Sequence, residues 1–249
     1  EGNAVIDGVL LPQQAAALRA EVEAAHHDGK LAHAGLVNGK IASVDASTYM
    51  EKATRGDVIG WFDSDTKGWP YGRQLDAYLT KLGTMIAELG GGSGSGAALV
   101  PELSRITGRS KAMVACYPGD GARYIRHVDN DGKHELCRTR VLTALMYLNE
   151  NWRPGDGGEL AIFAPGDAGR EREVVQPLAN RILLFWSDWR TPHEVRPAYK
   201  PRYAVTLWLL DNTCNGQLHS APGKVEIRTT SLRELNEGIN GQVDDDDPE

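Results

Sequence analysis

Several features that define other classes of protein are scarce in this chain. It has only three cysteines, Cys116, Cys137 and Cys214, which are too few and too widely spaced for a disulfide scaffold or a cysteine metal cluster. We therefore expect a reducing compartment, the cytoplasm or alternatively the nucleus. No apolar run approaches the length of a membrane span, and the first residues lack the pattern of a signal peptide, so we expect no membrane partner.

The chain also has no excess of positive charge. Its 27 Lys and Arg residues are outnumbered by 34 Asp and Glu residues, which gives a formal net charge of −7. This balance argues against broad nucleic-acid binding. Part of the negative charge lies in the aspartate run 244–247, which we expect to be a solvated tail.

A chain of 249 residues, 41% of them hydrophobic, is long enough for one domain with a large core, and we expect a single domain over 1–249. Helical periodicity predicts helices over 12–27, 71–89 and 100–107, so residues 1–110 are expected to give helical support. A long connection at about 36–62 is uncommon unless it has a function, and a mobile lid is our interpretation, with an edge hairpin as the alternative. Residues 212–249 are expected to hold a short helix and the acidic tail.

Residues 111–211 show a different pattern of short β-rich runs. These runs are 112–117, 141–148, 159–163, 173–176, 182–186 and 203–210, and clusters of Gly, Pro, Asn and Asp separate them. Several short strands with such breaks predict a sandwich or jelly roll. The expected fold is mainly β, with helices packed on one face of a double-stranded barrel core.

The most informative pattern is His127-Val128-Asp129, followed far downstream by His193. Side chains at i and i+2 of an extended segment point to the same side, so His127 and Asp129 can reach one ion together. By itself an H-x-D pattern is weak, because any surface strand can carry it. With His193 added, two imidazoles and one carboxylate cover one face of an octahedron, which suits a non-haem Fe(II) oxygenase.

Arg202 follows His193 closely and supplies a permanent, fork-shaped cation. The open metal positions would accept a chelating 2-oxo acid and dioxygen, and the remote carboxylate of the acid needs a buried cation such as Arg202. Tyr147 can donate a further hydrogen bond to that carboxylate. Tyr117 also lies in a predicted strand that can face the cavity. Ordinary half-buried strand residues remain the alternative interpretation of both tyrosines.

Longer stretches around these residues make the pattern specific. They are MVACYPG (113–119), YIRHVDN (124–130), MYLN (146–149), GELAIF (158–163), LFWSD (184–188), PHEVRPAY (192–199) and RYAVTLW (202–208). Together they resemble the catalytic domain of the HIF prolyl hydroxylases, with the related Skp1 and bacterial prolyl hydroxylases close by. The match is strong over about 111–211. N-terminal to this range, the family's mobile substrate-covering loop has an end that resembles Arg55-Gly56-Asp57 followed by Trp61.

The resemblance implies a single catalytic domain with a double-stranded β-helix core of the jelly-roll, cupin-like type. It implies a prolyl 4-hydroxylase of the procollagen and HIF type, a dioxygenase that uses Fe(II), 2-oxoglutarate and O2, with ascorbate as a further candidate cofactor. His127, Asp129 and His193 are then the implied iron ligands, and Arg202 is the further catalytic residue. The implied cosubstrate-binding residues are Arg202, Tyr147, Tyr117, Met113, Leu145, Leu160 and Val195.

The implied reaction is formation of trans-4-hydroxyproline in a protein of HIF-like or Skp1-like type, with oxygen sensing as a biological role. The residues implied near the target proline are Tyr124, Arg140, Trp208, Asp57 and Trp61. The chain departs from the animal members at 36–57, 90–96 and 131–136. Because loops set partner choice, these differences leave the identity of the protein substrate open.

Two other interpretations remain at this point. A 2-oxoglutarate oxygenase acting on a small molecule or free amino acid would have a deep, closed pocket, whereas an open groove favours a polypeptide. A non-catalytic binding module would be suggested by loss of a ligand, but all three ligand residues are present in the sequence.

Overall fold

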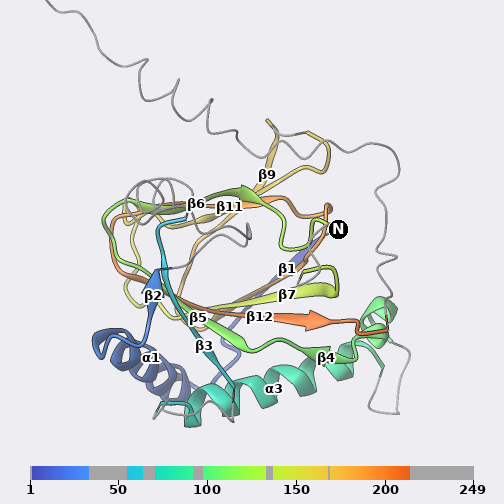
Figure 1. The fold of residues 1–249 in the computed structure, drawn as a ribbon, viewed down its shortest axis with the longest axis horizontal. Coiled ribbons are helices and arrows are strands. Elements are labelled where there is room, and N and C mark those ends of the chain that lie inside the picture. The colour runs from blue at the N-terminus through green and yellow to red at the C-terminus, as the bar shows by residue number, and fades with distance from the viewer. Residues whose placement is uncertain are drawn as a thin grey trace, which may run out of the picture.

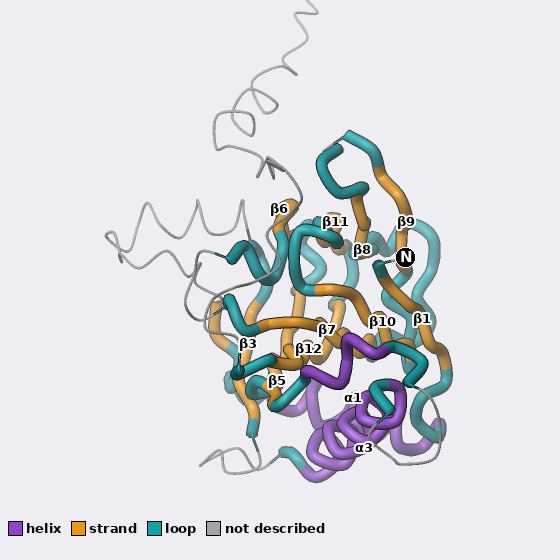
Figure 2. Tube along the Cα trace, turned by 90° about the vertical axis from the view of Figure 1, so that its right-hand side faces the viewer, coloured by secondary structure: helices purple, strands orange, loops and turns teal. Residues whose placement is uncertain are grey.

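The computed structural model describes residues 2–33, 55–63, 71–91, 98–132, 137–167 and 169–213. In these ranges an eight-stranded sheet faces a four-stranded sheet, and two helices cover the outer side of the larger sheet (Figure 1). The view at 90° in Figure 2 shows the same order of layers, with the helices below the larger sheet and the smaller sheet above it. Most of the expected lid, the short C-terminal helix and the acidic tail lie outside the described residues.

The two helices lie where the hydrophobic periodicity predicts them. Helix α1 (Pro12–His27) begins at a proline, whose fixed φ suits a first helical turn. Helix α3 (Arg73–Leu89) presents a leucine-rich stripe to the core. The third predicted helix is a shorter 3-10 helix, η1 (Pro101–Arg105). All three predictions of helix position are confirmed, and only the type of the third differs.

A carboxylate on α1 fixes how α3 begins. The Glu21 side chain accepts hydrogen bonds from the backbone N–H groups of Gln74 and Leu75, at 2.9 and 3.2 Å. These N–H groups have no partner within the helix, and a negative charge at a helix N-terminus is favourable. Leu18 of α1 and Leu82 of α3 are buried in one hydrophobic cluster beneath the larger sheet. Each such leucine contributes about 1.5–3 kcal/mol of burial free energy.

The larger sheet has its strands in the order β1-β10-β7-β12-β5-β3-β2, with β4 pairing β12 beside this path. Its strands are β1 (Asn3–Asp7), β2 (Ala32–His33), β3 (Val58–Phe62), β4 (Gly108–Arg109), β5 (Ala112–Tyr117), β7 (Arg140–Tyr147), β10 (Arg181–Trp186) and β12 (Arg202–Leu210). All the pairings are antiparallel. The end of the expected loop at 36–62 is therefore strand β3, which pairs β5 in the sheet.

The smaller sheet has the order β6-β11-β8-β9. Its strands are β6 (Ala122–His127), β8 (Leu160–Phe163), β9 (Glu171–Val175) and β11 (His193–Ala198). The pattern of β-rich runs in 111–211 missed β6 and β11, because these strands carry several Arg, His or Glu residues and few aliphatic ones. The expected jelly-roll arrangement of two antiparallel sheets is nevertheless confirmed.

Strand β12 shows how the fold gives the two faces of the larger sheet different roles. Its side chains alternate between the faces, as in any strand. Tyr203, Val205 and Leu207 belong to the cluster under the helices, whereas Ala204 belongs to a separate cluster that includes residues of the smaller sheet. The alternation therefore directs Arg202 into the space between the sheets, where it lines the cavity.

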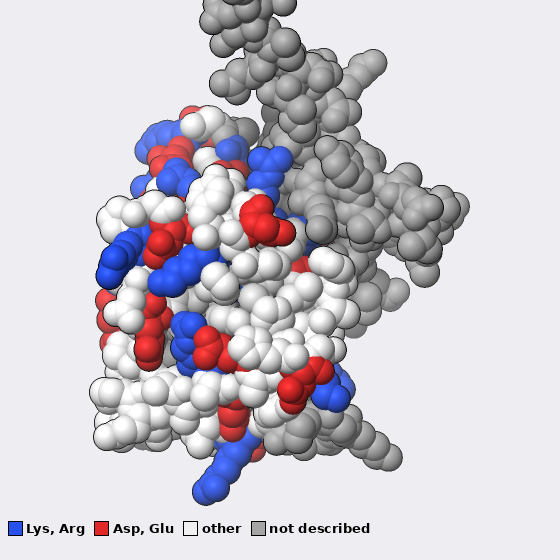
Figure 3. All heavy atoms as spheres, turned by 90° about the vertical axis from the view of Figure 1, so that its left-hand side faces the viewer, with Lys and Arg blue, Asp and Glu red and all other residues white. Residues whose placement is uncertain are grey.

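The surface carries charges of both signs. On the face drawn in Figure 3, the described Lys and Arg side chains lie next to Asp and Glu side chains. None of the described helices has the length and apolar character needed to cross a membrane.

Candidate active site

The ends of two strands of the smaller sheet bring the predicted metal ligands together. Strand β6 ends at His127 and β11 begins at His193, and these two residues are direct partners in the antiparallel pairing. Asp129 follows two residues after His127, and its Oδ1 lies 3.8 Å from His127 Nε2. One ligand atom from each of the three residues lies within 4.8 Å of the others. The geometry is that of a three-ligand metal site.

Backbone carbonyl groups set the orientation of both imidazoles. Nδ1 of His127 lies 2.8 Å from the carbonyl oxygen of Ile125, and Nδ1 of His193 lies 2.9 Å from that of Thr191. A carbonyl oxygen only accepts, so Nδ1 carries the proton in each ring and donates it. Each Nε2 is then left with a lone pair, which is the arrangement that metal-binding histidines use.

The charge states of the triad also suit a divalent cation. Burial, with the neighbouring His193, holds the pKa of His127 far below its usual range, so this ring is neutral at neutral pH. Burial tends to raise the pKa of Asp129, but His193, His127, Arg140 and a hydrogen bond from Thr143 outweigh it and lower the pKa. At neutral pH the Asp129 carboxylate is therefore ionised and the His127 imidazole is neutral. These are the forms of the two side chains that bind a metal ion.

Side chains packed around the triad restrict its movement. The Tyr124 ring stacks on His127 with 3.8 Å between ring centres, and Phe185 meets His193 edge-on at 4.6 Å. Thr143 Oγ1 donates a hydrogen bond of 2.6 Å to Asp129 Oδ2. Each of the three ligands thus has a neighbour that limits rotation of its side chain.

Deeper in the same cavity, Arg202 presents a cation to the space between the sheets. The residue is 1% exposed, and its Nε donates a 2.7 Å hydrogen bond to the carbonyl oxygen of Gly158. Its guanidinium carbon lies 4.8 Å from the centre of the Tyr117 ring and 5.1 Å from that of Tyr147. Gly158 allows this close approach, because a Cβ there would lie 2.8 Å from Arg202 Cδ.

Two buried donor atoms, one in this guanidinium and one next to it, have no hydrogen-bond partner among the described residues. They are Nη2 of Arg202 and Oη of Tyr147. Burial raises the pKa of Tyr147 to about 12, so its hydroxyl keeps its proton and can donate. A buried donor without a partner costs about 1–3 kcal/mol. A carboxylate placed between these two groups would satisfy both donors and the positive charge.

The triad and Arg202 lie in one cavity of about 650 Å³ between the sheets. Most of the predicted site residues line it: His127, Asp129, His193, Arg202, Tyr117, Met113, Leu145, Leu160, Val195, Tyr124, Arg140, Trp208 and Trp61. Tyr147 and Asp57 are the two predicted residues that do not line it. Tyr147 is fully buried beside Arg202, and Asp57 is buried as the partner of an arginine.

That arginine is Arg55, which the sequence analysis did not assign to the site. Its Nε and Nη2 donate to the two oxygens of Asp57 at 2.7 and 3.1 Å, and Nη2 also lies 3.2 Å from Met113 Sδ. The guanidinium carbon lies 4.8 Å from the centre of the Tyr124 ring. Asp57 therefore contributes to the cavity by holding Arg55 on its wall.

The outer part of the cavity is aromatic and cationic. The Arg140 guanidinium lies 3.8 Å from the centre of the Trp208 ring, and Trp61 lies 5.9 Å from Trp208 between ring centres. Trp61 is 43% exposed, which is unusual for a large aromatic side chain. Nε1 of Trp208 is buried without a hydrogen-bond partner among the described residues. This region is suited to packing against part of a larger molecule.

Three residues of the site were missed by reasoning from sequence, namely Arg55, Thr143 and Phe185. Arg55 stood in a motif that had been noted, so its charge was an available signal. Thr143 and Phe185 lie within ordinary β-rich runs, and no local pattern distinguishes them from core residues.

These residues fit the groups that the sequence pattern implies. Two imidazole nitrogens and one carboxylate oxygen are a donor set for Fe(II). The unpartnered donors of Arg202 and Tyr147 fit the carboxylate of a 2-oxo diacid.

Comparisons with known proteins agree with this geometry. A family model described as the 2OG-Fe(II) oxygenase superfamily matches residues 112–210. Egl nine homolog 1 from Rattus norvegicus is 37% identical over 211 residues, which cover 84% of this chain and 55% of the rat protein. The chain thus spans about half the length of such curated relatives.

Shorter relatives are covered more fully. Prolyl hydroxylase EGLN3 from Mus musculus is 38% identical over 191 residues, which cover 76% of this chain and 70% of the mouse protein. A solved prolyl hydroxylase from Trichoplax adhaerens, in complex with a hypoxia inducible factor oxygen degradation domain peptide fragment, has a TM-score of 0.67 and 34% identity. That match covers 85% of this chain and 84% of the Trichoplax chain. With identity and coverage at these levels, the chain belongs to the EGLN family of prolyl hydroxylases within the 2OG-Fe(II) oxygenase superfamily.

Proposed function

We propose that this protein is a 2-oxoglutarate- and Fe(II)-dependent dioxygenase that converts a prolyl residue of a protein to trans-4-hydroxyproline. The observation that carries the proposal is the presence, in one cavity, of the three-residue metal site and of Arg202 with an unpartnered donor. The protein substrate is of HIF-like or Skp1-like type, and oxygen sensing is the corresponding biological role.

In this proposal His127, Asp129 and His193 hold the iron. Arg202 and Tyr147 bind the remote carboxylate of 2-oxoglutarate by charge-assisted hydrogen bonds. When bound, iron and 2-oxoglutarate supply the activation of dioxygen, coupled to decarboxylation of the 2-oxo acid. The other cosubstrate-binding residues, Tyr117, Met113, Leu145, Leu160 and Val195, line the cavity and exclude water from the reacting groups.

The target proline would lie nearer the opening. Tyr124 covers one side of the His127 ring, and Arg140 with Trp208 forms a stacked pair on the wall of the cavity. Trp61 supplies an exposed aromatic surface beside them, and Asp57 acts through its ion pair with Arg55. Exposed large aromatic residues at the edge of a polar site are typical of peptide and protein recognition.

We further propose that the described ranges belong to a single catalytic domain, in which residues 1–110 support the core at 111–211. The free thiols of Cys116 and Cys137 are consistent with a reducing compartment, and we place the protein in the cytoplasm or the nucleus. Ascorbate would serve as a reductant that keeps iron in the ferrous state.

The proposed reaction is tested with purified chain, Fe(II), ascorbate, 2-oxoglutarate and O2. Peptides from HIF-like and Skp1-like proteins, each with one candidate proline, are matched with peptides in which alanine replaces that proline. We expect one peptide to gain one oxygen atom on the proline by mass spectrometry, with succinate formed in equal amount.

Free proline and other small acceptors are run alongside in the same assay. Hydroxylation of a small acceptor, with no peptide modified, would favour the small-molecule alternative over the protein substrate. Absence of any 2-oxoglutarate-dependent product, with a known prolyl hydroxylase active under the same conditions, would contradict both.

A further inference from the structure

We propose that Thr143 and Ser187 form a hydroxyl relay that positions the Asp129 carboxylate for metal binding. Thr143 Oγ1 lies 2.6 Å from Asp129 Oδ2, and Ser187 Oγ lies 2.9 Å from Thr143 Oγ1. Neither hydroxyl residue is among the metal or cosubstrate residues described above. The inference rests on the proposed function of the triad as a metal site.

The direction of the hydrogen bonds follows from the number of protons. An ionised carboxylate only accepts, so Thr143 uses its one hydroxyl proton on Asp129. The contact between Thr143 and Ser187 must then have Ser187 as the donor. The hydroxyl of Ser187 thereby polarises that of Thr143 and strengthens its bond to the carboxylate, because hydrogen bonds in a chain are cooperative.

The relay lies in a buried part of the larger sheet. Thr143 is 1% exposed in the middle of β7, and Ser187 is fully buried directly after β10. The two strands are paired, with Phe185 opposite Thr143. A threonine has few accessible rotamers, so its hydroxyl is held in place by the sheet.

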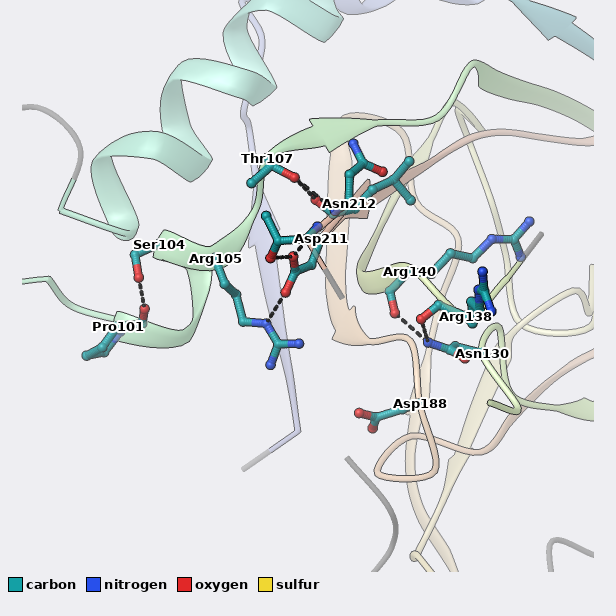
Figure 4. A network of polar contacts seen from close by, with 12 residues as sticks. Pro101, Ser104, Arg105, Thr107, Asn130, Arg138, Arg140, Asp188, Asp211 and Asn212 are labelled. Atoms are coloured by element: carbon teal, nitrogen blue, oxygen red, sulfur yellow. Dashed lines mark hydrogen bonds and ion pairs between the residues drawn. The ribbon is translucent and has the colours of Figure 1, made fainter. Parts of the chain in front are cut away.

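Hydrogen bonds with Ser187 and with nearby residues also hold the backbone around Asp129 in place. The N–H of Asn130 donates a 2.8 Å hydrogen bond to the carbonyl oxygen of Ser187. The Asn130 side-chain amide donates to the carbonyl oxygens of Arg138 and Arg140, at 3.2 and 2.7 Å (Figure 4). Arg140 Nη1 in turn donates to the carbonyl oxygen of Asp129 at 3.1 Å. With the backbone fixed, the rotation of the carboxylate is the remaining freedom of this ligand.

The relay removes that freedom. Rotation about the terminal bond of an aspartate has a broad energy profile, so an unrestrained carboxylate samples many orientations. With Oδ2 bonded to Thr143, Oδ1 is the oxygen directed to the triad, 3.8 Å from His127 Nε2. The relay therefore presents one oxygen to the metal and keeps the second away from the positions that the cosubstrates need.

Substitutions at these two positions test the relay without depending on catalysis. Thr143→Val keeps the branched shape and removes the hydroxyl, Thr143→Ser keeps the hydroxyl, and Ser187→Ala removes only the donor to Thr143. The probe is Co(II) alone, titrated into the metal-free protein and followed by its visible absorption, which reports both affinity and coordination. The Tm of each metal-free variant checks the fold.

We expect Thr143→Val to weaken Co(II) binding about 10- to 100-fold, the usual effect of removing a hydrogen-bond partner of a metal ligand, and to change the visible spectrum. Thr143→Ser should keep the affinity and spectrum of the unmodified chain, and Ser187→Ala should weaken binding by a smaller factor. If Thr143→Val does not fold, the comparison of Thr143→Ser with Ser187→Ala still tests the relay.

Three results would overturn the relay while leaving the metal site intact. They are wild-type affinity and spectrum in Thr143→Val, an equal loss of affinity in Thr143→Val and Thr143→Ser, or wild-type behaviour of Ser187→Ala. Failure of the unmodified chain to bind Co(II) would instead overturn the proposed metal site, and the relay with it.

Discussion

Replacing Asp129 with alanine is expected to abolish 2-oxoglutarate-dependent turnover, with a fall in kcat/KM on the order of a thousandfold or more, which corresponds to about 4 kcal/mol. Asp129 supplies the only carboxylate in the described metal cluster, and its oxygen lies among the two histidine nitrogens. Without it the ion loses its anionic ligand, and the two imidazoles alone hold a divalent cation weakly. His127→Ala should have a comparable effect.

The measurement is succinate formation with saturating 2-oxoglutarate, together with the iron retained after gel filtration. Asp167→Ala is the matched control, because the side chain of this exposed aspartate accepts a hydrogen bond from the backbone N–H of Gly169 within its own turn. Activity of Asp129→Ala within tenfold of the unmodified chain would show that the triad is not the metal site.

The second large effect is expected for Arg202→Ala, which should weaken the binding of 2-oxoglutarate. The substitution removes a buried, charge-assisted contact of roughly 1.5–3 kcal/mol, which corresponds to a rise of about 10- to 150-fold in KM for 2-oxoglutarate. We expect kcat at saturating 2-oxoglutarate to fall much less, because Arg202 binds the end of the cosubstrate that does not react. Arg202→Lys should not restore the affinity, because an ammonium group lacks the planar fork.

Succinate formation over a range of 2-oxoglutarate concentrations gives both constants. Arg196→Ala serves as the control, because that arginine forms a half-exposed ion pair with Glu171. An unchanged KM in Arg202→Ala, in a variant with normal Tm, would mean that another residue anchors the cosubstrate.

Reasoning from sequence succeeded where spacing along one strand decides geometry. His127 and Asp129 are two positions apart and their ligand atoms meet at 3.8 Å, as predicted, although Asp129 lies two residues beyond the end of β6 and Val128 also lines the cavity. The same alternation along β12 predicts that Arg202 faces away from the helix-side residue Tyr203. The resemblance to prolyl hydroxylases then supplied the connection between these distant segments.

The sequence could not reveal contacts that depend on how two distant strands are placed. Thr143 and Ser187 meet because β7 pairs β10, and neither residue stands out in its own segment. Arg55 was noted only as part of a motif, and its position beside Tyr124 depends on the isolated bridge that joins these two residues. A contact between side chains on opposite sides of a cavity produces no periodic pattern in the sequence.

The buried positions of Tyr147 and Asp57 were hidden for the same reason. Tyr147 was predicted to bind the cosubstrate and Asp57 to lie near the substrate, and both are fully or almost fully buried behind an arginine that lines the cavity. In the proposed function Asp57 acts through Arg55, whereas the Tyr147 hydroxyl donates to the cosubstrate carboxylate together with Arg202. Only the three-dimensional arrangement separates a residue on a cavity wall from the residue that holds it there.

The most direct test of the account is an anaerobic titration of the iron-loaded chain with 2-oxoglutarate, followed by visible absorption. Chelation of ferrous iron by a 2-oxo acid produces a charge-transfer band, so we predict that this band appears and saturates at one equivalent of each component. The band should be absent in Asp129→Ala and should require higher 2-oxoglutarate in Arg202→Ala. A protein that binds iron without ever giving this band, or that gives it equally well in Asp129→Ala, would contradict the proposal that these side chains form one site.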